Sequence, residues 1–204
     1  MMKLCIRWVS SIIGLVLVYQ TQSSAQSDAA AGSVKFEPCV GCHAKPGYAN
    51  AVPRFQVPKL GGQQQAYLIA ALTAYSLGQR AHAGMKGNAE GLSEKDIQDI
   101  AAYLSGLELA SSDENISGNA QTGKEKAAAC VACHGENGNS SDENFPKLAG
   151  QYQSYLIKAL RDYQSGQRDN PMMAGMVKEL SDEDIEDISA YFASQSKGLS
   201  VVER

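Results

Sequence analysis

The chain has 204 residues, with 18 Lys and Arg against 22 Asp and Glu and a formal net charge of −4 at pH 7. This length suits one large or two small domains, and the charge balance excludes a strongly basic nucleic-acid-binding protein. Hydrophobic residues make up 44% of the chain and charged residues 20%. Such a composition is typical of a soluble globular protein and excludes a disordered chain or a membrane bundle.

The first 25 residues have the pattern of a secretory signal peptide. Lys3 and Arg7 precede an apolar run over residues 8–19, and residues 23–25 are small at the positions that a signal peptidase reads. We therefore expect residues 1–25 to be cleaved, so that the exported protein begins at Gln26. The alternative is a retained membrane anchor, but this apolar run is shorter than the roughly 20 residues that span a bilayer.

An internal duplication organises the rest of the chain. Residues 60–105 align with residues 148–193 at a constant offset of 88, and 23 of the 46 positions are identical. Two copies of about 85 residues indicate a tandem domain duplication and not a solenoid, which needs three or more short repeats. We assign residues 26–110 to the first domain and 111–204 to the second. The linker lies at about 106–119, where helical periodicity is lost.

Both copies are predicted to be all-α, with three to four helices in each. Apolar residues recur at i, i+3, i+4 and i+7 from Leu68, a glycine follows the run, and the second copy repeats the pattern. Ser93 and Ser181 have an Asp three residues later, which predicts that they cap the start of a last helix. A shorter helix is expected to start near Gly32 and near Gly123, before each cysteine motif.

The candidate chemistry is concentrated in two C-x-x-C-H motifs. Two thiols three positions apart on a helical turn can bond the two vinyl groups of a haem, and the adjacent His can ligate its iron. We therefore predict two covalently bound haem c groups per chain, each held by two cysteines and one His ligand. The first motif comprises Cys39, Cys42 and His43, and the second comprises Cys130, Cys133 and His134.

Two other interpretations of the cysteines compete with haem. The two motifs could together make a four-cysteine zinc site, or each could be a dithiol redox centre. Zinc leaves the His of each motif unexplained, and a dithiol redox fold needs a βαβ pattern that the sequence does not have. The export signal and the helical repeats favour haem.

The duplication also selects a second iron ligand for each haem. Met85 and Met173 align at the offset of 88, whereas Met172 aligns with Gly84. An isolated Met is usually core filler, but these two occupy the same place in both copies, in what the sequence predicts to be a loop. We predict that Met85 ligates the iron of haem 1 and Met173 that of haem 2. Met172 is the main competitor in the second copy.

Other repeated polar residues have two interpretations. Arg80, Arg168, Lys59 and Lys147 are candidates to pair with haem propionates, and the alternative is that they are solvated charges. His82 is expected to be an exposed loop residue and not an iron ligand.

Together these motifs resemble those of cytochrome c4, a dihaem class I cytochrome c of bacterial periplasms, over roughly residues 32–196. The resemblance implies two cytochrome c folds related by approximate twofold symmetry, each wrapped around one covalent haem, with the haem propionate edges facing each other. It also implies that Pro58 and Pro146 offer their carbonyls to the rings of His43 and His134. Residues 44–57 depart from the family pattern.

The same resemblance implies a periplasmic carrier of single electrons, from a quinol-oxidising complex to a terminal oxidase. On this interpretation the protein is not an enzyme, binds redox proteins and no nucleic acid, and is a monomer. After signal cleavage it would have no membrane span and at most a loose membrane association. The alternatives are the haem subunit of an exported flavoprotein dehydrogenase of the sulfide-oxidising type and a dihaem peroxidase. Two aligned methionines argue against the peroxidase, which needs an open ligand position.

The formal charge is unevenly distributed over the mature chain. Residues 26–110 hold seven acids and seven bases, whereas residues 111–204 hold fifteen acids and nine bases. Acids cluster at the start of the last predicted helix, where they also interact favourably with the helix dipole. The functional interpretation is that the second domain is steered toward a basic docking surface.

Overall fold

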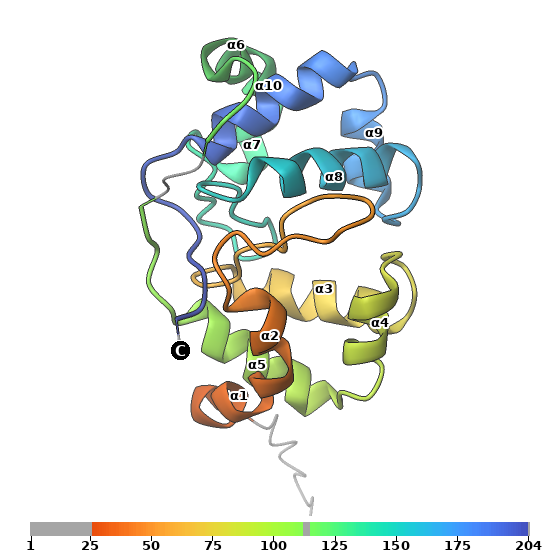
Figure 1. The fold of residues 1–204 in the computed structure, drawn as a ribbon, viewed down its shortest axis with the longest axis vertical. Coiled ribbons are helices and arrows are strands. Elements are labelled where there is room, and N and C mark those ends of the chain that lie inside the picture. The colour runs from red at the N-terminus through yellow and green to blue at the C-terminus, as the bar shows by residue number, and fades with distance from the viewer. Residues whose placement is uncertain (1–25, 112–114, 204) are drawn as a thin grey trace, which may run out of the picture.

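The computed structural model describes residues 26–111 and 115–203 as two helical halves stacked along the long axis of the molecule (Figure 1). The predicted signal peptide lies outside the described residues. The first half contains α1 (Ala29–Lys35), η1 (Glu37–Cys39), α2 (Val40–His43), α3 (Gln65–Ser76), α4 (Ala83–Ala89) and α5 (Glu94–Ser105). The second half contains α6 (Ala120–Lys126), η2 (Ala127–Ala129), α7 (Val131–His134), α8 (Gln153–Gln164), α9 (Pro171–Val177) and α10 (Asp182–Ala193).

The all-α prediction is confirmed, since residue pairing outside helices in the described ranges is limited to isolated bridges. The expected number of helices was too low. Within residues 26–111 and 115–203 each half has five α-helices, because the cysteine motif and the segment that holds the aligned Met each form a short helix of their own. None of the described helices is long and apolar enough to cross a bilayer.

The predicted helix ends of the longer helices are confirmed. Ser93 and Ser181 cap α5 and α10, and in both cases the Asp three residues later completes a capping box. Gly78 and Gly166 follow α3 and α8 with φ of +75° and +74°, a backbone conformation that favours glycine. The sequence therefore determines where these four helices begin or end.

The first helix of each half begins three residues before the glycine at which we expected it to start. Gly32 and Gly123 instead lie inside α1 and α6, where these helices cross α5 and α10. A Cβ atom on Gly32 would lie 1.9 Å from the carbonyl oxygen of Asp99, and one on Gly123 would lie 1.9 Å from that of Asp187. The glycines are thus required for close contact between backbones and do not mark a helix start.

A buried carboxylate fixes the same crossing in each half. Asp99 accepts hydrogen bonds from the Lys35 ammonium (2.8 Å) and from the backbone N–H of Asp28 (2.7 Å). Asp187 accepts from the ammonium of Lys126 and from the backbone just before α6, both at 2.8 Å. The first and last helices of each half are therefore joined by packing and by an ion pair.

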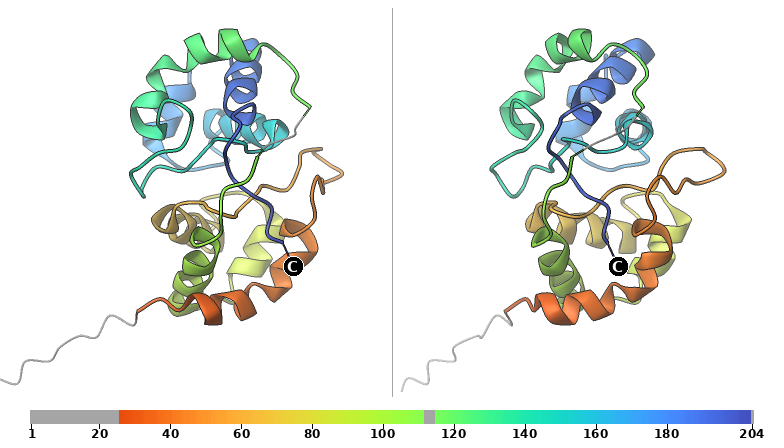
Figure 2. Two further views of the ribbon diagram at one scale, coloured as in Figure 1. Left: turned by 90° about the vertical axis from the view of Figure 1, so that its left-hand side faces the viewer. Right: turned by 60° about the vertical axis from the view of Figure 1, so that its left-hand side comes forward.

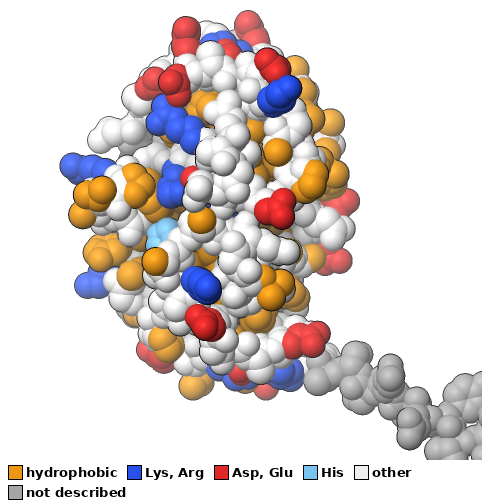
Figure 3. All heavy atoms as spheres, turned by 90° about the vertical axis from the view of Figure 1, so that its right-hand side faces the viewer, with side chains coloured by type: hydrophobic (Ala, Val, Ile, Leu, Met, Phe, Trp, Pro, Cys, Tyr) orange, Lys and Arg blue, Asp and Glu red, His pale blue; other side chains and the backbone are white. Residues whose placement is uncertain are grey.

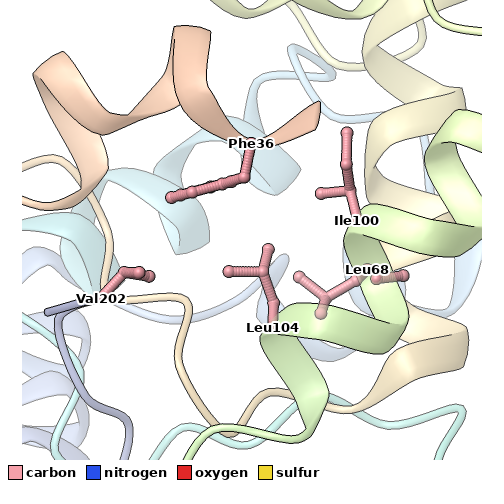
Figure 4. Packing of buried hydrophobic residues seen from close by; sticks show 6 residues of the cluster. Phe36, Leu68, Ile100, Leu104 and Val202 are labelled. Atoms are coloured by element: carbon pink, nitrogen blue, oxygen red, sulfur yellow. The ribbon is translucent and has the colours of Figure 1, made fainter. Parts of the chain in front are cut away.

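The core of the first half includes a residue from the far end of the chain. Figure 4 shows side chains from α1, α3, α5 and the C-terminal region pointing toward one another. Phe36 and Val202 are almost completely buried in this cluster. The labelled members are Phe36, Leu68, Ile100, Leu104 and Val202.

The C-terminal segment, residues 197–203, runs from the second half across to the first, beside the linker (Figure 2). Gly198 and Ala110 exchange two backbone hydrogen bonds, and Ser200 and Gly61 do the same. The second half therefore supplies part of the first half's core through Val202.

The two halves meet through reciprocal contacts. The Lys59 ammonium donates a hydrogen bond to the carbonyl of Gly150 (2.6 Å), and the Lys147 ammonium donates one to the carbonyl of Gly62 (2.7 Å). Each donor and acceptor in one contact is the duplicate of that in the other, which is the pattern of a twofold axis. The halves are therefore related by approximate twofold symmetry across their interface.

Two glutamines reinforce this interface in the same reciprocal way. The side-chain amide of Gln151 donates to the Lys59 carbonyl and accepts from its N–H, both at 3.0 Å. Gln63 pairs with the backbone of Lys147 at 3.0 and 2.8 Å. Side chains of each half thus complete backbone hydrogen bonding in the other.

Loop 44–57, which departs from the family pattern, lies between the halves and against α8 (Figure 1). The backbone N–H of Gly47 donates to the Tyr152 hydroxyl (2.8 Å), and that of Gln56 donates to the Ser154 hydroxyl (3.0 Å). Phe55 is buried in this loop. The loop therefore contributes to the interface in a way that the second copy does not reproduce.

The buried ion pairs predict how stability depends on pH. Hydrogen bonds from Lys35 and Lys95 hold the pKa of Asp99 well below its usual range, and Lys126 lowers the pKa of Asp187. A carboxylate with a lowered pKa stabilises the fold fully at pH values above its unfolded-state pKa of about 4. This stabilisation is lost as the pH falls toward and through the folded-state pKa. We expect Asp99→Asn and Asp187→Asn to lower the free energy of unfolding more at pH 7 than at pH 3, as measured by denaturant titration.

The matched control for this prediction is Glu90→Gln, which removes an exposed carboxylate of the first half. It is expected to unfold at the same denaturant concentration as the unaltered protein at both pH values. Equal losses for Asp99→Asn at pH 7 and pH 3 would contradict the prediction.

Candidate haem sites

One cavity of about 870 Å³ extends into both halves of the molecule. Its volume lies in the range of ligand and cofactor cavities, and most of its lining is apolar. The structure brings every sequence-predicted haem residue to its wall. These residues are Cys39, Cys42, His43 and Met85 of the first half and Cys130, Cys133, His134 and Met173 of the second.

A tight helical turn presents each cysteine motif to the cavity. Cys39 ends η1, and Cys42 and His43 follow in the single turn of α2. The second motif repeats this arrangement around η2 and α7. None of the four cysteines in the described residues forms a disulfide, so their thiols are available for thioether bonds.

The motif histidines are buried, and each is held by a proline carbonyl. Nδ1 of His43 lies 3.0 Å from the Pro58 oxygen, and Nδ1 of His134 lies 2.9 Å from the Pro146 oxygen. This confirms the expectation for the two prolines. Burial lowers the pKa of both rings, against the opposing effect of the carbonyls. A neutral ring that donates through Nδ1 leaves Nε2 free to ligate a metal.

The aligned methionines lie on short helices, not in loops as we expected. Met85 is the third residue of α4 and Met173 the third residue of α9. The N–H of Met85 donates to Nδ1 of His82, and the N–H of Met173 donates to Oδ1 of Asn170, both at 3.0 Å. The two methionines are therefore positioned by equivalent N-caps. Asn170 followed by a proline is a helix-start signal, and it would have predicted α9 from the sequence.

The expectation for His82 was wrong. It is half-buried and caps α4, whereas we expected an exposed loop residue. Its ring makes edge contacts with Phe55 and Tyr75, at centroid distances of 6.1 and 6.4 Å. Its ring nitrogen holds the N-terminus of the helix that bears Met85.

The methionines of α9 differ in exposure. Met172 is 62% exposed and Met176 is 47% exposed, whereas Met173 is half-buried. All three line the cavity. Burial and the equivalence with Met85 favour Met173 as the iron ligand, which stays a prediction.

Three of the four repeated basic residues, Arg80, Arg168 and Lys59, are buried, which excludes solvated charges as their interpretation, whereas Lys147 is half-buried. Both arginines and both repeated lysines line the cavity. Among the described residues, Nε of Arg80 and the hydroxyl of Ser189 are buried without a hydrogen-bond partner. Buried donors of this kind need an acceptor. An apolar cavity with cationic residues in its wall fits a haem with its two carboxylates.

Burial and the neighbouring arginines act in opposite directions on the pKa values of the tyrosines beside them. Burial raises the pKa of Tyr67 to about 12, although Arg80 opposes the shift. For Tyr155, the raising effect of burial is outweighed by Arg168 and Arg80, which lower its pKa to about 8.

The zinc interpretation is not supported by the geometry. Within the described ranges, no three His, Cys, Asp or Glu side chains lie close enough together to hold a metal ion. The two cysteine motifs therefore do not combine into a four-cysteine site.

Comparison with known proteins gives a consistent result. The family profile described as "Cytochrome c" matches residues 29–108 and 120–196. Cytochrome c4 of Pseudomonas aeruginosa is 48% identical over 89 residues, which are 44% of this chain and 44% of that relative. The alignment thus spans less than half of the curated relative.

Solved structures extend the likeness to both halves. Reduced recombinant cytochrome c4 from Pseudomonas stutzeri aligns with a TM-score of 0.67 and 32% identity, over 83% of this chain and 99% of that one. A thiosulfate dehydrogenase from Marichromatium purpuratum aligns with a TM-score of 0.68 and 28% identity, over 80% of this chain and 39% of that one.

The family profile matches each half separately, and each half carries one C-x-x-C-H motif. The structure places both motifs on the wall of a cavity that fits the cofactor. The chain therefore belongs to the cytochrome c family, with two cytochrome c domains that each bind one covalent haem c.

Proposed function

We propose that this chain is a dihaem electron carrier and not an enzyme. One observation carries the proposal: both cysteine motifs and both aligned methionines line the same cavity. The cysteines form the thioether bonds. His43 and Met85 ligate the iron of haem 1, and His134 and Met173 that of haem 2. One His and one Met would hold each iron, and this ligand set would leave no open site for a substrate.

The chain's own residues keep the ligands in place. When bound, each haem c gains or loses one electron at its iron, taken from a reduced partner or given to an oxidised one. The carbonyls of Pro58 and Pro146 orient the two imidazoles. The N-caps of α4 and α9 orient the two methionines. Ligands that are held in this way need little rearrangement when the charge of the iron changes.

The partners we propose are a quinol-oxidising complex as donor and a terminal oxidase as acceptor, both in the periplasm. The likeness to cytochromes c4 supports this assignment. The proposed domains are residues 26–110 and 111–204, in a monomer. The C-terminal segment, although it belongs to the second of these domains in sequence, packs on the first.

A second candidate function is that of a haem subunit within a larger dehydrogenase. It is favoured by the alignment with 39% of the Marichromatium purpuratum thiosulfate dehydrogenase, which shows that a pair of such domains can form part of a longer protein. Native mass and co-purification of the protein from its own cells discriminate between the two. A free carrier elutes alone, whereas a subunit elutes with a dehydrogenase.

Replacement of either aligned Met tests the ligation. Oxidised His–Met haems show a weak charge-transfer band at the red end of the visible spectrum. We expect Met85→Ala and Met173→Ala each to remove about half of this band, because each variant loses one of two Fe–S bonds. Pyridine haemochrome quantitation should still give two haems per chain in both variants.

The control for the second site is Met172→Ala, which truncates the exposed neighbour on α9. It should leave the band at full intensity. Loss of the band in Met172→Ala with retention in Met173→Ala would show that the assigned ligand is wrong.

The proposed export predicts the start of the mature protein. Covalent haem attachment and the signal-like first 25 residues require the same exported compartment, so we expect the N-terminus at Gln26. Intact mass of the protein purified from the periplasmic fraction tests this, with two haems added to the chain mass. A mass that retains residues 1–25 would instead favour an anchored cytochrome.

The uneven charge predicts a salt effect on one half only. Figure 3 shows acidic side chains at the end of the molecule formed by the second half, and others elsewhere on this face, while by sequence residues 111–204 hold fifteen acids against nine bases. Exposed charges steer a partner over about 8 Å at physiological ionic strength. We expect electron exchange with a basic redox protein through the second half to slow about tenfold between roughly 10 and 200 mM salt. Exchange through the nearly neutral first half should change little.

Stopped-flow rates across a salt series measure this effect. The double variant Glu179→Gln/Glu183→Gln, which removes two exposed carboxylates of the second half, should reduce the salt slope. Equal salt slopes for a basic and an uncharged reaction partner would contradict steering and leave the acids with a structural role.

A further inference from the structure

Loop 44–57 ends in an exposed tip that has no counterpart in the second half. An antiparallel bridge between Ala49 and Gln56 closes the loop into a small hairpin. Residues 51–54, which lie between the two bridged positions, are all exposed. Figure 2 shows the loop projecting away from the helices of both halves.

The exposed side chains of this loop are apolar or basic. Val52 at the tip is 92% exposed, and Tyr48 is 45% exposed. Lys45 and Arg54 are exposed as well, and in the described part of the chain neither of them forms an ion pair. The loop contains no Asp or Glu. An apolar centre with a charged border is the composition of a contact surface.

The duplicate loop, residues 135–145, has the opposite charge. It carries three acids, Glu136, Asp142 and Glu143, and no Lys or Arg, whereas loop 44–57 carries two bases and no acid. The mature protein as a whole is acidic, because residues 111–204 hold fifteen acids against nine bases. Loop 44–57 is therefore a locally positive site on a negative protein, and a partner that recognises it has to present negative charge.

Contacts with the second half hold the base of the loop and leave its tip free. The Ser154 hydroxyl donates to the side-chain carbonyl of Gln56 (2.9 Å), and the Lys158 ammonium lies 5.1 Å from the ring centroid of Phe55. The backbone of Gly47 is held by a hydroxyl of the second half as well. A tip on a fixed base loses little conformational entropy when a partner covers it.

The same loop borders the first haem site. Asn50, Phe55 and Val57 line the cavity, and the carbonyl of the next residue, Pro58, holds the ring of His43. A partner seated on the tip is therefore placed beside the first-half haem, and short distance is what electron transfer between two proteins requires.

A protein suits this loop better than a membrane does. The apolar part of the tip is Val52 with its small neighbours, whereas stable attachment to a bilayer takes more than one such signal. The excess acids of residues 111–204 are repelled by anionic lipids. Transient protein interfaces, in contrast, are among the smallest known.

We propose that the exposed part of loop 44–57 docks a redox protein that offers an apolar recess bordered by carboxylates, and that this protein exchanges one electron with the first-half haem. Val52 enters the recess, and Lys45 and Arg54 pair with the carboxylates. This proposal rests on the proposed function, which supplies the haem. The acidic second half suits a basic partner, so the two halves accept partners of opposite charge and do not compete for one partner.

A plastocyanin, a small copper protein, chosen for an apolar face bordered by carboxylates is the probe for this site. Its affinity for the mature protein with both haems is measured with both proteins oxidised, so that binding is separated from electron transfer. Salt of about 0.1 M screens charges that lie more than roughly 10 Å apart and leaves the short contacts at the loop. Stopped-flow rates from the reduced protein to the oxidised probe are measured under the same conditions.

Variants of the tip separate its apolar and its charged contributions. We expect Val52→Ser to weaken binding about tenfold, because the side chain that fills the recess becomes polar. Lys45→Gln/Arg54→Gln should weaken binding about fivefold, since two exposed ion pairs are lost. The rate of electron transfer at low probe concentration should fall by similar factors.

Two exposed positions outside the loop provide matched controls. Val34→Ser makes the same replacement at a valine of α1 that is 71% exposed. Glu143→Gln removes an exposed charge from the duplicate loop. Both should change affinity and rate less than twofold. Because all the replaced side chains are exposed, every variant should keep two haems per chain and the melting temperature of the unaltered protein.

Several results would overturn the docking site while leaving the carrier function in place. These are no binding of the probe by the unaltered protein, and equal affinity in the unaltered protein and both loop variants. Sedimentation with phosphatidylglycerol vesicles that Val52→Ser abolishes would identify the loop as a membrane contact. A dimer that Val52→Ser dissociates would identify a second copy of this chain as the occupant. Fewer than two haems per chain would overturn the proposed function itself.

Discussion

Two lysines, of which Lys59 is buried and Lys147 half-buried, donate to carbonyls across the interface and hold the two halves in register. Lys59 and Lys147 each place an ammonium against a backbone oxygen of the opposite half. A buried ammonium is costly without partners, so these contacts restrict the interface to one arrangement. Because the same lysines line the cavity, the arrangement of the halves also fixes how the two haem sites face each other.

The cofactor is part of the architecture as well as of the chemistry. A half of about 85 residues buries little apolar surface by itself. The inner faces of its helices line a cavity, and Leu68, Ile100 and Leu104 contribute both to the first-half core and to the cavity wall. A covalently attached porphyrin supplies the missing apolar volume. Stability and electron storage therefore depend on the same bonds from Cys39, Cys42 and their duplicates.

Sequence periodicity and the repeat offset predicted the longer helices and the caps of α5 and α10, but placed the paired methionines in loops and not on the short helices α4 and α9. They did not predict that Arg80 and Arg168 are buried, because burial of a charge depends on the surface packed against it and not on local spacing. The short helix α9 could have been predicted from Asn170 and its following proline, but α4 is capped by His82 and has no comparable signal. Loop 44–57 has no duplicate, so the repeat could not indicate its contacts with α8.

The C-terminal segment imposes an order on assembly. A chain that is made from its N-terminus presents α1 to α5 long before Val202 follows. Until then the first-half core lacks the side chain that packs between Phe36 and its neighbours, and Gly61 lacks its backbone partner. The first half is consequently synthesised first, but its hydrophobic core is completed last. The core of the first half therefore stays incomplete until the last residues of the chain have been made and have packed on it.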